Sequence, residues 1–247
     1  MHIATHGIVA SSVGGSTPAF TNTLSTTFDG TDDYVNIGDS NSLSFGNGTT
    51  DTPFSISSWW YMTNASNFRG FQKFNSLTNC EYRLNGTANS LRFAICDANF
   101  YNRKEIVFAN LSTYENQWIN VIATYNANGL NSGMKLYING TQVSTTDNNQ
   151  GTYVAMHNTT SDVTISKLLT NYSNGKVDET AVFNSELSAS DASAIGSTTP
   201  TDLTSYSPLS WWRMGDGDTY PTITDNAGSN DGLMKNMSAA NFVADVP

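Results

Sequence analysis

The stretch from residue 118 to 140, WINVIATYNANGLNSGMKLYING, constrains the fold most, because its apolar and polar side chains alternate. Apolar residues recur at every second position from Ile119 to Tyr125 and again from Met134 to Ile138. This period of two predicts two β-strands. The Asn, Gly and Ser residues between them favour a chain reversal, and Asn139-Gly140 suits a tight turn into a third strand. Three antiparallel strands with one apolar face each need a second sheet to cover that face, so the stretch predicts a β-sandwich.

Length and composition agree with one all-β domain. A chain of 247 residues buries about 70–75% of its unfolded surface in a single domain, so no second domain is required. Charged residues make up 13% of the chain, and the polar positions are dominated by Asn, Ser and Thr, which favour turns and pleated surfaces over long helices. We therefore expect little helix.

Charge and hydropathy exclude two classes of partner. The net charge is −10, with 11 basic residues, so nucleic acid and anionic membrane surfaces would be repelled. No stretch approaches the ~20 apolar residues of a membrane-spanning helix. The N-terminus lacks the basic and apolar regions of a signal peptide, so we expect synthesis and assembly in a cytosol.

The first twenty residues carry one short apolar run, at positions 7–10, and too few apolar residues to form a strand pair alone. We expect residues 1–20 to form an extended arm that docks on a neighbouring subunit. Its candidate attachment side chains are Ile3, Ile8 and Val9. The rest of the chain, 21–247, is expected to be one domain.

The two cysteines lie on the arms of a predicted hairpin, in strands 80–84 and 91–96. If the apolar residues of both arms share a face, Cys80 lies opposite Ile95 and Cys96 points to the other face. A disulfide then needs a register slip or a bulge. Free thiols, which suit a reducing cytosol, are favoured over a disulfide. The disulfide remains an alternative.

Four motifs in order resemble one fold family. FDGTDDYV begins at residue 28, FSISSWW at 54, WINVIATYN with KLYINGTQV at 118, and GKVDETAVFNSELSASDASAI at 175. Their order and spacing resemble the laminin-G-like, concanavalin A-like jelly-roll modules, especially those of bacteria and their phages. The resemblance covers about residues 24–196. It implies an all-β, antiparallel two-sheet jelly roll.

One short helix is expected near residues 188–196. Ser188 or Ser190 can cap its N-terminus, and Asp191 lies in its first turn, near the partial positive charge of the helix end. Gly196 is expected to end it.

The C-terminal segment 208–237, PLSWWRMGDGDTYPTITDNAGSNDGLMKNM, resembles the segment that usually opens such modules. Either the module is circularly permuted or a truncated second repeat begins here. A lone hairpin would be marginal in water, so we favour permutation, in which 208–237 completes the sandwich. Since neighbouring strand residues point to opposite faces, Trp59-Trp60 and Trp211-Trp212 should each contribute one core ring and one candidate surface ring.

Enzymatic chemistry lacks its usual motifs. The glucanases of the superfamily place Glu-X-Asp-X-(X)-Glu on one strand face, and no glutamate here is followed by an aspartate two residues later. His2, His6 and His157 have no companions at zinc-ligand spacing. Neither a nucleophile elbow nor a phosphate-binding glycine loop occurs. We therefore expect a protein that is not an enzyme.

Calcium is the candidate cofactor, because jelly rolls of this superfamily often carry one ion at the sandwich edge. By resemblance its ligands match Asp29, the Gly30 carbonyl and Asp178; carboxylate and carbonyl oxygens suit Ca²⁺. The alternative is that Asp29 caps its own turn and Asp178 accepts hydrogen bonds from nearby amides.

Carbohydrate binding is the activity the superfamily most often shows. The segment 97–103, DANFYNR, offers aromatic rings beside amide side chains and a guanidinium, which suits a sugar. The candidate binding residues are Asn99, Phe100, Tyr101, Asn102 and Arg103. The alternative is that these aromatics complete the core.

The short polar arm, the Asn/Ser/Thr-rich jelly roll, the missing secretion signal and the WWRMGD ending together look like the laminin-G-like proteins of bacteriophage virions. This resemblance implies a capsid decoration protein or a tail or fibre appendage on the virion surface. Its expected partners are other virion proteins, further copies of the chain and a host surface glycan. The alternatives are a free carbohydrate-binding or adhesion module and, less favoured, a glycoside hydrolase.

Overall fold

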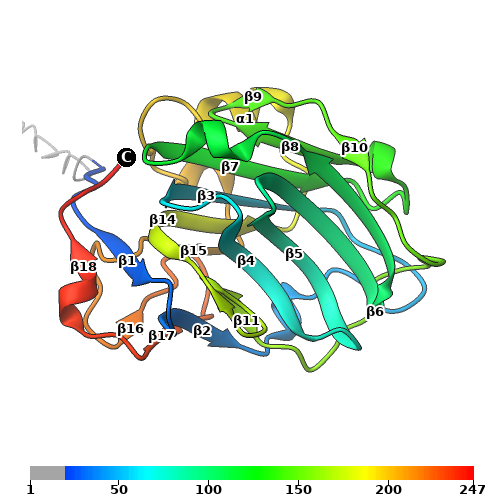
Figure 1. Ribbon diagram of the computed structural model, residues 1–247, viewed down its shortest axis with the longest axis horizontal. Coiled ribbons are helices and arrows are strands. Elements are labelled where there is room, and N and C mark those ends of the chain that lie inside the picture. Colours follow the sequence, from blue (N-terminus) through cyan, green and yellow to red (C-terminus); the bar gives the residue numbers. More distant parts are fainter. Residues whose placement is uncertain (1–19) are drawn as a thin grey trace, which may run out of the picture.

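The computed structural model describes residues 20–247. The predicted attachment residues Ile3, Ile8 and Val9, with all of the predicted arm except Phe20, lie outside this range. The described chain folds into two stacked antiparallel sheets (Figure 1). The sandwich and the jelly-roll class predicted from the sequence are therefore confirmed.

Sheet A follows the order β18-β1-β14-β3-β7-β8-β9, with β15 also paired to β14. Its strands are β18 (Phe242–Val243), β1 (Ser25–Asp29), β14 (Asn174–Phe183), β3 (Phe54–Met62), β7 (Trp118–Tyr125), β8 (Met134–Ile138), β9 (Thr141–Gln142) and β15 (Ser210–Trp212).

Sheet B follows the order β10-β6-β5-β4-β11-β2-β17-β16. Its strands are β10 (Thr146–Asp147), β6 (Ser90–Phe108), β5 (Asn79–Thr87), β4 (Asn67–Ser76), β11 (Val163–Ile165), β2 (Tyr34–Gly38), β17 (Gly232–Lys235) and β16 (Thr222–Ile223). A separate hairpin joins β12 (Lys167–Leu168) to β13 (Asn171–Tyr172).

Helical structure is short, as the composition predicts. The single α-helix of the described residues is α1 (Ala189–Ile195). Ser188 caps it, since its hydroxyl accepts from the Asp191 amide while the Asp191 carboxylate accepts from Ser188 N–H. The five 3₁₀ turns of residues 20–247 are η1 (Asn41–Leu43), η2 (Leu111–Tyr114), η3 (Asn131–Gly133), η4 (Thr204–Tyr206) and η5 (Ala239–Asn241). None of the described helices is long and apolar enough to cross a membrane.

The alternating stretch forms β7 and β8 as predicted, with Val121 opposite Ile138 and Tyr125 opposite Met134. The inward residues join one core between the sheets. That core is rich in aromatic pairs such as Phe45 stacked on Phe54 at 4.4 Å. Aromatic pairs of this kind add about 0.5–1.5 kcal/mol beyond the area they bury.

Gly70 permits one close approach inside this core. A Cβ at this position would lie 2.0 Å from Cζ2 of Trp60, whose indole is completely buried. Only glycine therefore lets β4 lie against the Trp60 ring.

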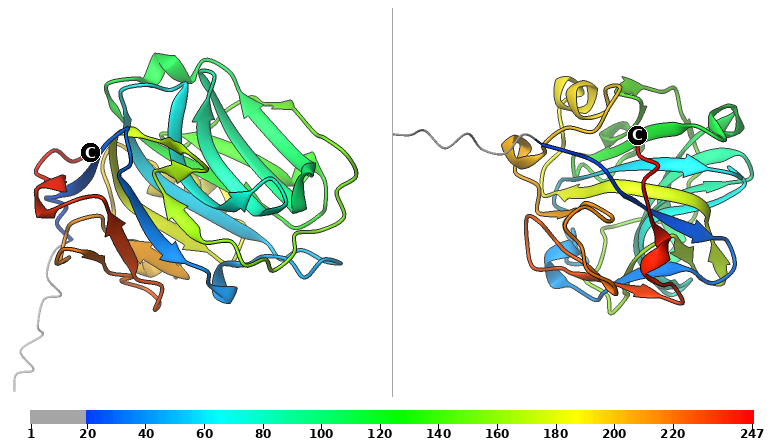
Figure 2. Two further views of the ribbon diagram at one scale, coloured as in Figure 1. Left: turned by 60° about the horizontal axis from the view of Figure 1, so that its bottom comes forward. Right: turned by 90° about the vertical axis from the view of Figure 1, so that its left-hand side faces the viewer.

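The C-terminal segment returns into both sheets, so the prediction that it completes the sandwich is confirmed. Two strands share one edge of β14: β1 pairs with residues 174–177, and β15 pairs with residues 180–182. β17 pairs with β2, and β18 pairs with β1 (Figure 2, right). Trp212 is fully buried, lies 5.7 Å from Phe71 between ring centroids, and donates its indole N–H to the Asn230 carbonyl at 2.7 Å.

The expectation of one surface ring in each tryptophan pair is wrong. Trp60 and Trp212 do point into the core, and their neighbours point to the outer face of sheet A. However, Trp59 is only 4% exposed and Trp211 only 6%. Trp211 is buried because α1 and the residues around it cover this face, and because Phe20 stacks on its ring at 6.1 Å.

The cysteines are both free and buried, as favoured from the sequence. The expected register is wrong at this point: a bulge between Cys80 and Tyr82 places Cys80 opposite Ala98 instead of Ile95. Both thiols then join one cluster on the outer face of sheet B, with Phe74.

Candidate functional site

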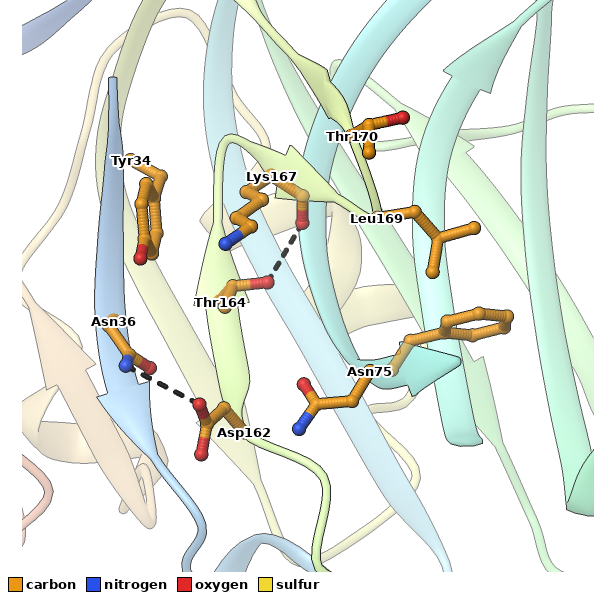
Figure 3. A pocket seen from close by; sticks show the side chains of 9 residues that line it. Tyr34, Asn36, Asn75, Asp162, Thr164, Lys167, Leu169 and Thr170 are labelled. Atoms are coloured by element: carbon orange, nitrogen blue, oxygen red, sulfur yellow. Dashed lines mark hydrogen bonds between the residues drawn. The ribbon is translucent and has the colours of Figure 1, made fainter. Parts of the chain in front are cut away.

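A cavity of about 430 Å³ lies on the outer face of sheet B (Figure 3). It is formed by β2, the end of β4, the start of β11 and the β12–β13 hairpin. Its lining residues are Tyr34, Asn36, Phe74, Asn75, Asp162, Thr164, Lys167, Leu169 and Thr170. The sheet forms the floor and the hairpin forms one wall.

The floor follows from the alternation of the strands. Val35 of β2 points into the core and is fully buried, so its neighbours Tyr34 and Asn36 point outward. Thr164 lies opposite Asn36, on the outer face of β11. These short polar side chains on a rigid sheet make the floor of a preformed site.

The wall is held by hydrogen bonds to a single carbonyl. The Lys167 carbonyl accepts from Thr164 Oγ1 at 2.8 Å and from the amide nitrogen of Gln72. Ser166 and Leu169 adopt positive φ values of 70° and 57°, which turn the chain on either side of β12. The backbone of the hairpin is therefore fixed relative to the floor.

An aromatic group and a charge meet at the top of the cavity. The Lys167 Nζ lies 4.0 Å from the centroid of the Tyr34 ring and 5.9 Å from that of Tyr172. Such a contact contributes about 0.5–1 kcal/mol where the cation stays partly exposed. It fixes the ammonium group at the cavity, available to a ligand oxygen.

Asp162 and Asn36 form the opposite end. Asn36 Nδ2 donates to Asp162 Oδ2 at 3.4 Å, which leaves the other carboxylate oxygen and the Asn75 amide available to a ligand (Figure 3). Amides, hydroxyls and one carboxylate around an aromatic ring suit a ligand with many hydroxyl groups. Of the nine lining residues, all within the described chain, only Asp162 carries a carboxylate. Glycoside hydrolysis by the usual mechanism needs two.

The predicted sugar-binding segment lies beside this cavity and does not line it. Two guanidinium groups lie over the Phe100 ring, that of Arg83 at 4.1 Å and that of Arg103 at 4.2 Å from its centroid. The Phe100 ring also packs edge-on against Phe74, with 5.3 Å between the ring centroids. Phe74 is a lining residue of the cavity. The arginines and Phe74 thus pack against the Phe100 ring, where a sugar would have to stack. This agrees with the alternative that Phe100 completes a hydrophobic cluster.

Asn99 and Arg103 of that segment are engaged in hydrogen bonds within the protein. Asn99 Oδ1 accepts from the Tyr101 amide at 3.0 Å, and Arg103 donates to the Phe100 carbonyl at 3.1 Å and to Gln150. Tyr101 is 50% exposed, and Asn102 is partly buried.

The three predicted calcium ligands are not brought together. Asp29 pairs with Asn174, so Asp178 lies four residues farther along β14, or roughly 13 Å away. Asp29 and Gly30 form a tight turn in which the carboxylates of Asp29, Asp32 and Asp33 lie within 4.8 Å of one another. This cluster offers the hard oxygen ligands that Ca²⁺ prefers, without Asp178.

The turn carboxylates also have protein partners. Asp29 Oδ1 accepts from the Thr31 amide at 2.7 Å, which holds the pKa of Asp29 below its ordinary value. Asp33 Oδ2 accepts from the Asn241 side chain at 3.1 Å. Burial, followed by the neighbouring Asp29 charge, raises the pKa of Asp33. Asp29 thus caps its own turn, as the alternative expected, and the same turn also holds the three carboxylates that could bind a cation.

Asp178 lies in a different environment, at a bulge of β14. It is fully buried, accepts from the Asn22 side chain at 2.8 Å, and is followed by Glu179 with a φ of 42°. Burial raises the pKa of Asp178 well above its ordinary value and that of Glu179 to about 7. Glu179 is held by Trp211 and Arg213, which lie 2.5 Å and 3.0 Å from its oxygens. These carboxylates hold the start of the described chain against the C-terminal segment.

Sequence reasoning missed the cavity residues, chiefly Tyr34, Asn36, Asp162, Thr164 and Lys167. The signal for Tyr34 and Asn36 was present, since they alternate with Val35 and Ile37. The pairing of this strand with residues 163–165, more than 120 positions later, had no local signal.

Comparisons with known proteins support the fold. Residues 29–193 match the family model Laminin_G_3, described as the concanavalin A-like lectin/glucanases superfamily. No curated protein is significantly similar to the chain.

Solved structures show the same fold at low identity. A Bacteroides ovatus protein assigned as carbohydrate-binding is 14% identical, with a TM-score of 0.54 over 89% of this chain and 60% of its own. The binding domain of botulinum neurotoxin serotype D is 19% identical, with a TM-score of 0.48 over 72% of this chain and 43% of its own. The chain thus spans 60% or less of the length of these structures. The similarity to the Bacteroides ovatus protein supports the fold alone. The similarity to the neurotoxin domain is too weak to support any further conclusion.

Proposed function

Because the chain belongs to the concanavalin A-like lectin/glucanases superfamily, as a member of its Laminin_G_3 family, we propose that it binds a glycan in the cavity between β2, β11 and the β12–β13 hairpin. The observation that carries this proposal is the Tyr34 ring at the rim of a preformed polar cavity, with Lys167 held over it. An aromatic ring packs against the apolar face of a sugar, and amides and carboxylates bind its hydroxyls.

Each group has a role in this proposal. Tyr34 provides the stacking surface once a ligand oxygen has drawn the Lys167 ammonium away from its ring. Asn36 and Asp162 bind hydroxyl groups from the floor, and Lys167 donates to a ring or hydroxyl oxygen from the wall. The single carboxylate among the lining residues of the described chain favours binding over hydrolysis, so we propose a non-enzymatic module.

A glycan array tests the proposal. Wild-type protein should bind a defined set of glycans, and Asp162→Ala should bind the same set at least about tenfold more weakly. Leu130→Ala, which shortens a side chain that is 55% exposed and lies outside the cavity, is the matched control. Binding that Asp162→Ala leaves intact would place the glycan elsewhere, and measurable release of reducing sugar would support a hydrolase.

We further propose that this module is carried on a bacteriophage virion, with the sandwich facing outward and residues 1–20 as the attachment arm. The support is the resemblance of the motifs and the acidic net charge, which suits an outer surface better than contact with packaged DNA. Removing the arm up to residue 19, which keeps Phe20 stacked on Trp211, should leave a folded protein that no longer joins the particle. A truncated protein that still assembles would reject the arm, and a free adhesion module would show no particle association at all.

A further inference from the structure

A second cavity, of about 420 Å³, lies over the outer face of sheet A. β3 and β7 contribute one tryptophan each, and the turn after β8 and the end of α1 contribute polar groups. Its lining residues are Trp59, Trp118, Asn139, Ser193, Ser197 and Thr198. This cavity lies on the sheet opposite the first one.

The two indoles are neighbours on one face of the sheet. Trp59 lies opposite Asn120 and Tyr61 lies opposite Trp118, so Trp59 and Trp118 are diagonal partners. Trp118 is fixed from two sides, because its ring packs against Tyr61 at 5.8 Å and its indole N–H donates to Asp245 Oδ1 at 3.1 Å. The aromatic surface is therefore rigid before any ligand arrives.

The polar groups of the cavity have hydrogen-bonding capacity to spare. Asn139 Oδ1 accepts a hydrogen bond from the backbone N–H of Asn120 at 2.9 Å. The Asn139 Nδ2 has no hydrogen-bond partner among residues 20–247. The hydroxyls of Ser193, Ser197 and Thr198 line the opposite side.

A buried acceptor lies beside this cavity. The Asn120 side chain is fully buried, and its Oδ1 has no hydrogen-bond partner within the described chain. A Cβ at Gly196 would lie 2.8 Å from this oxygen, which places it next to the lining residue Ser197. The oxygen is buried, so it belongs to the protein behind the cavity wall and is not itself exposed to a ligand.

We propose that this second cavity binds a neutral saccharide unit. All six lining residues, which belong to the described chain, are uncharged, whereas the first cavity contains both Asp162 and Lys167. The Trp118 ring, with the small exposed part of Trp59, lies beside an amide and three hydroxyls, which matches the two kinds of surface of a pyranose ring. The two sites share no lining residue, so this site does not depend on the proposed function of the first.

Indole N–H resonances in NMR spectra test the proposal with three probes: the methyl glycosides of glucose, galactose and mannose at millimolar concentrations. At least one probe should shift the Trp59 and Trp118 signals while those of the core residues Trp60 and Trp212 stay in place. Shifts absent for all three probes, or equal for all the indoles, would overturn the site.

Two variants assign the shifts to the cavity. Ser197→Arg fills the cavity from an exposed position, and Trp118→Ala removes one wall; each should weaken the binding at least about tenfold. Ser197→Arg is the safer test because it removes no packed ring. Leu130→Ala, at an exposed position outside both cavities, should keep the shifts. Unchanged binding in a folded Ser197→Arg variant would contradict the proposal.

A variant in the first cavity separates this proposal from the first. Tyr34→Ala should leave the Trp59 and Trp118 shifts unchanged while weakening the binding of glycans selected on the array. If Tyr34→Ala instead removes the indole shifts, the second site is not independent and the inference fails. If Tyr34→Ala changes no binding at all, the first site fails while the second stands.

Discussion

The Lys167 ammonium lies 4.0 Å from the centroid of the Tyr34 ring, at the edge of the cavity on sheet B. The lysine comes from a short hairpin and the tyrosine from a strand over 130 residues earlier, so the fold assembles this pair. Tyr34→Ala should lower the affinity for an array-selected glycan by about 1–3 kcal/mol, since it removes the stacking surface. Calorimetric titration checks this, with Tyr34→Phe as the control that keeps the ring. Equal affinity of wild type and Tyr34→Ala would refute the role of Tyr34.

Much of the fold can be predicted from local patterns, because its strongest signals are local. The alternation in 118–140 identifies two strands and their turn, and Ser188 with Asp191 identifies the helix α1. The site depends instead on which strands become neighbours. Phe100 looks like a free platform in the sequence, yet Arg83, which lies seventeen residues earlier, covers its ring. Trp211 likewise looks like a surface ring until α1 and Phe20 cover it.

The C-terminal segment should be essential for stability. Trp212→Ala removes a fully buried indole from the core and should cost about 3–5 kcal/mol of unfolding free energy. Leu233→Ala, in the same segment but 43% exposed, should cost far less. Denaturant unfolding of both variants measures the difference. A Trp212→Ala protein as stable as wild type would show that this segment is not part of the cooperative core.

Stability should fall as the pH rises from about 4.5 to about 7. Burial raises the pKa of Glu179 from 4.5 to about 7, and it also raises the pKa of Asp178. The folded protein therefore binds more protons than the unfolded chain in this range, and each group stabilises the folded state more at the lower pH. For Glu179 the change is up to about 3 kcal/mol.

Melting temperatures measured across this pH range test the effect. Glu179→Gln keeps the size of the side chain and removes its titration, so the variant should show a flatter dependence than wild type. Parallel curves for the two proteins would contradict the assignment to Glu179.

Calcium, if it binds, should bind at the turn of residues 29–33. Addition of CaCl₂ should raise the melting temperature relative to EDTA; a ligand at 100 times its Kd adds about 2.7 kcal/mol. Asp29→Asn should abolish the increase, whereas Asp178→Asn should keep it, because Asp178 lies roughly 13 Å along β14 from this turn. An increase that depends on Asp178 and not on Asp29 would contradict this placement, and no increase at all would reject the ion.

Cys80 and Cys96 should be unreactive in the folded protein. Both are fully buried, and burial raises the pKa of the Cys96 thiol well above its ordinary value, so little reactive thiolate forms. A colorimetric thiol reagent should detect both thiols in denaturant and almost none without it. Rapid labelling of the native protein would show that this cluster opens, and no thiol in denaturant would indicate a disulfide.

The central claim is that glycans bind at the Tyr34 cavity, and a crystal structure of the chain with its strongest array-selected glycan tests it most directly. We predict a sugar ring packed against Tyr34, with hydroxyls bound to Asn36 and Asp162 and an oxygen near Lys167. A glycan seated instead on the segment from Asn99 to Arg103, with the Tyr34 cavity empty, would contradict the claim.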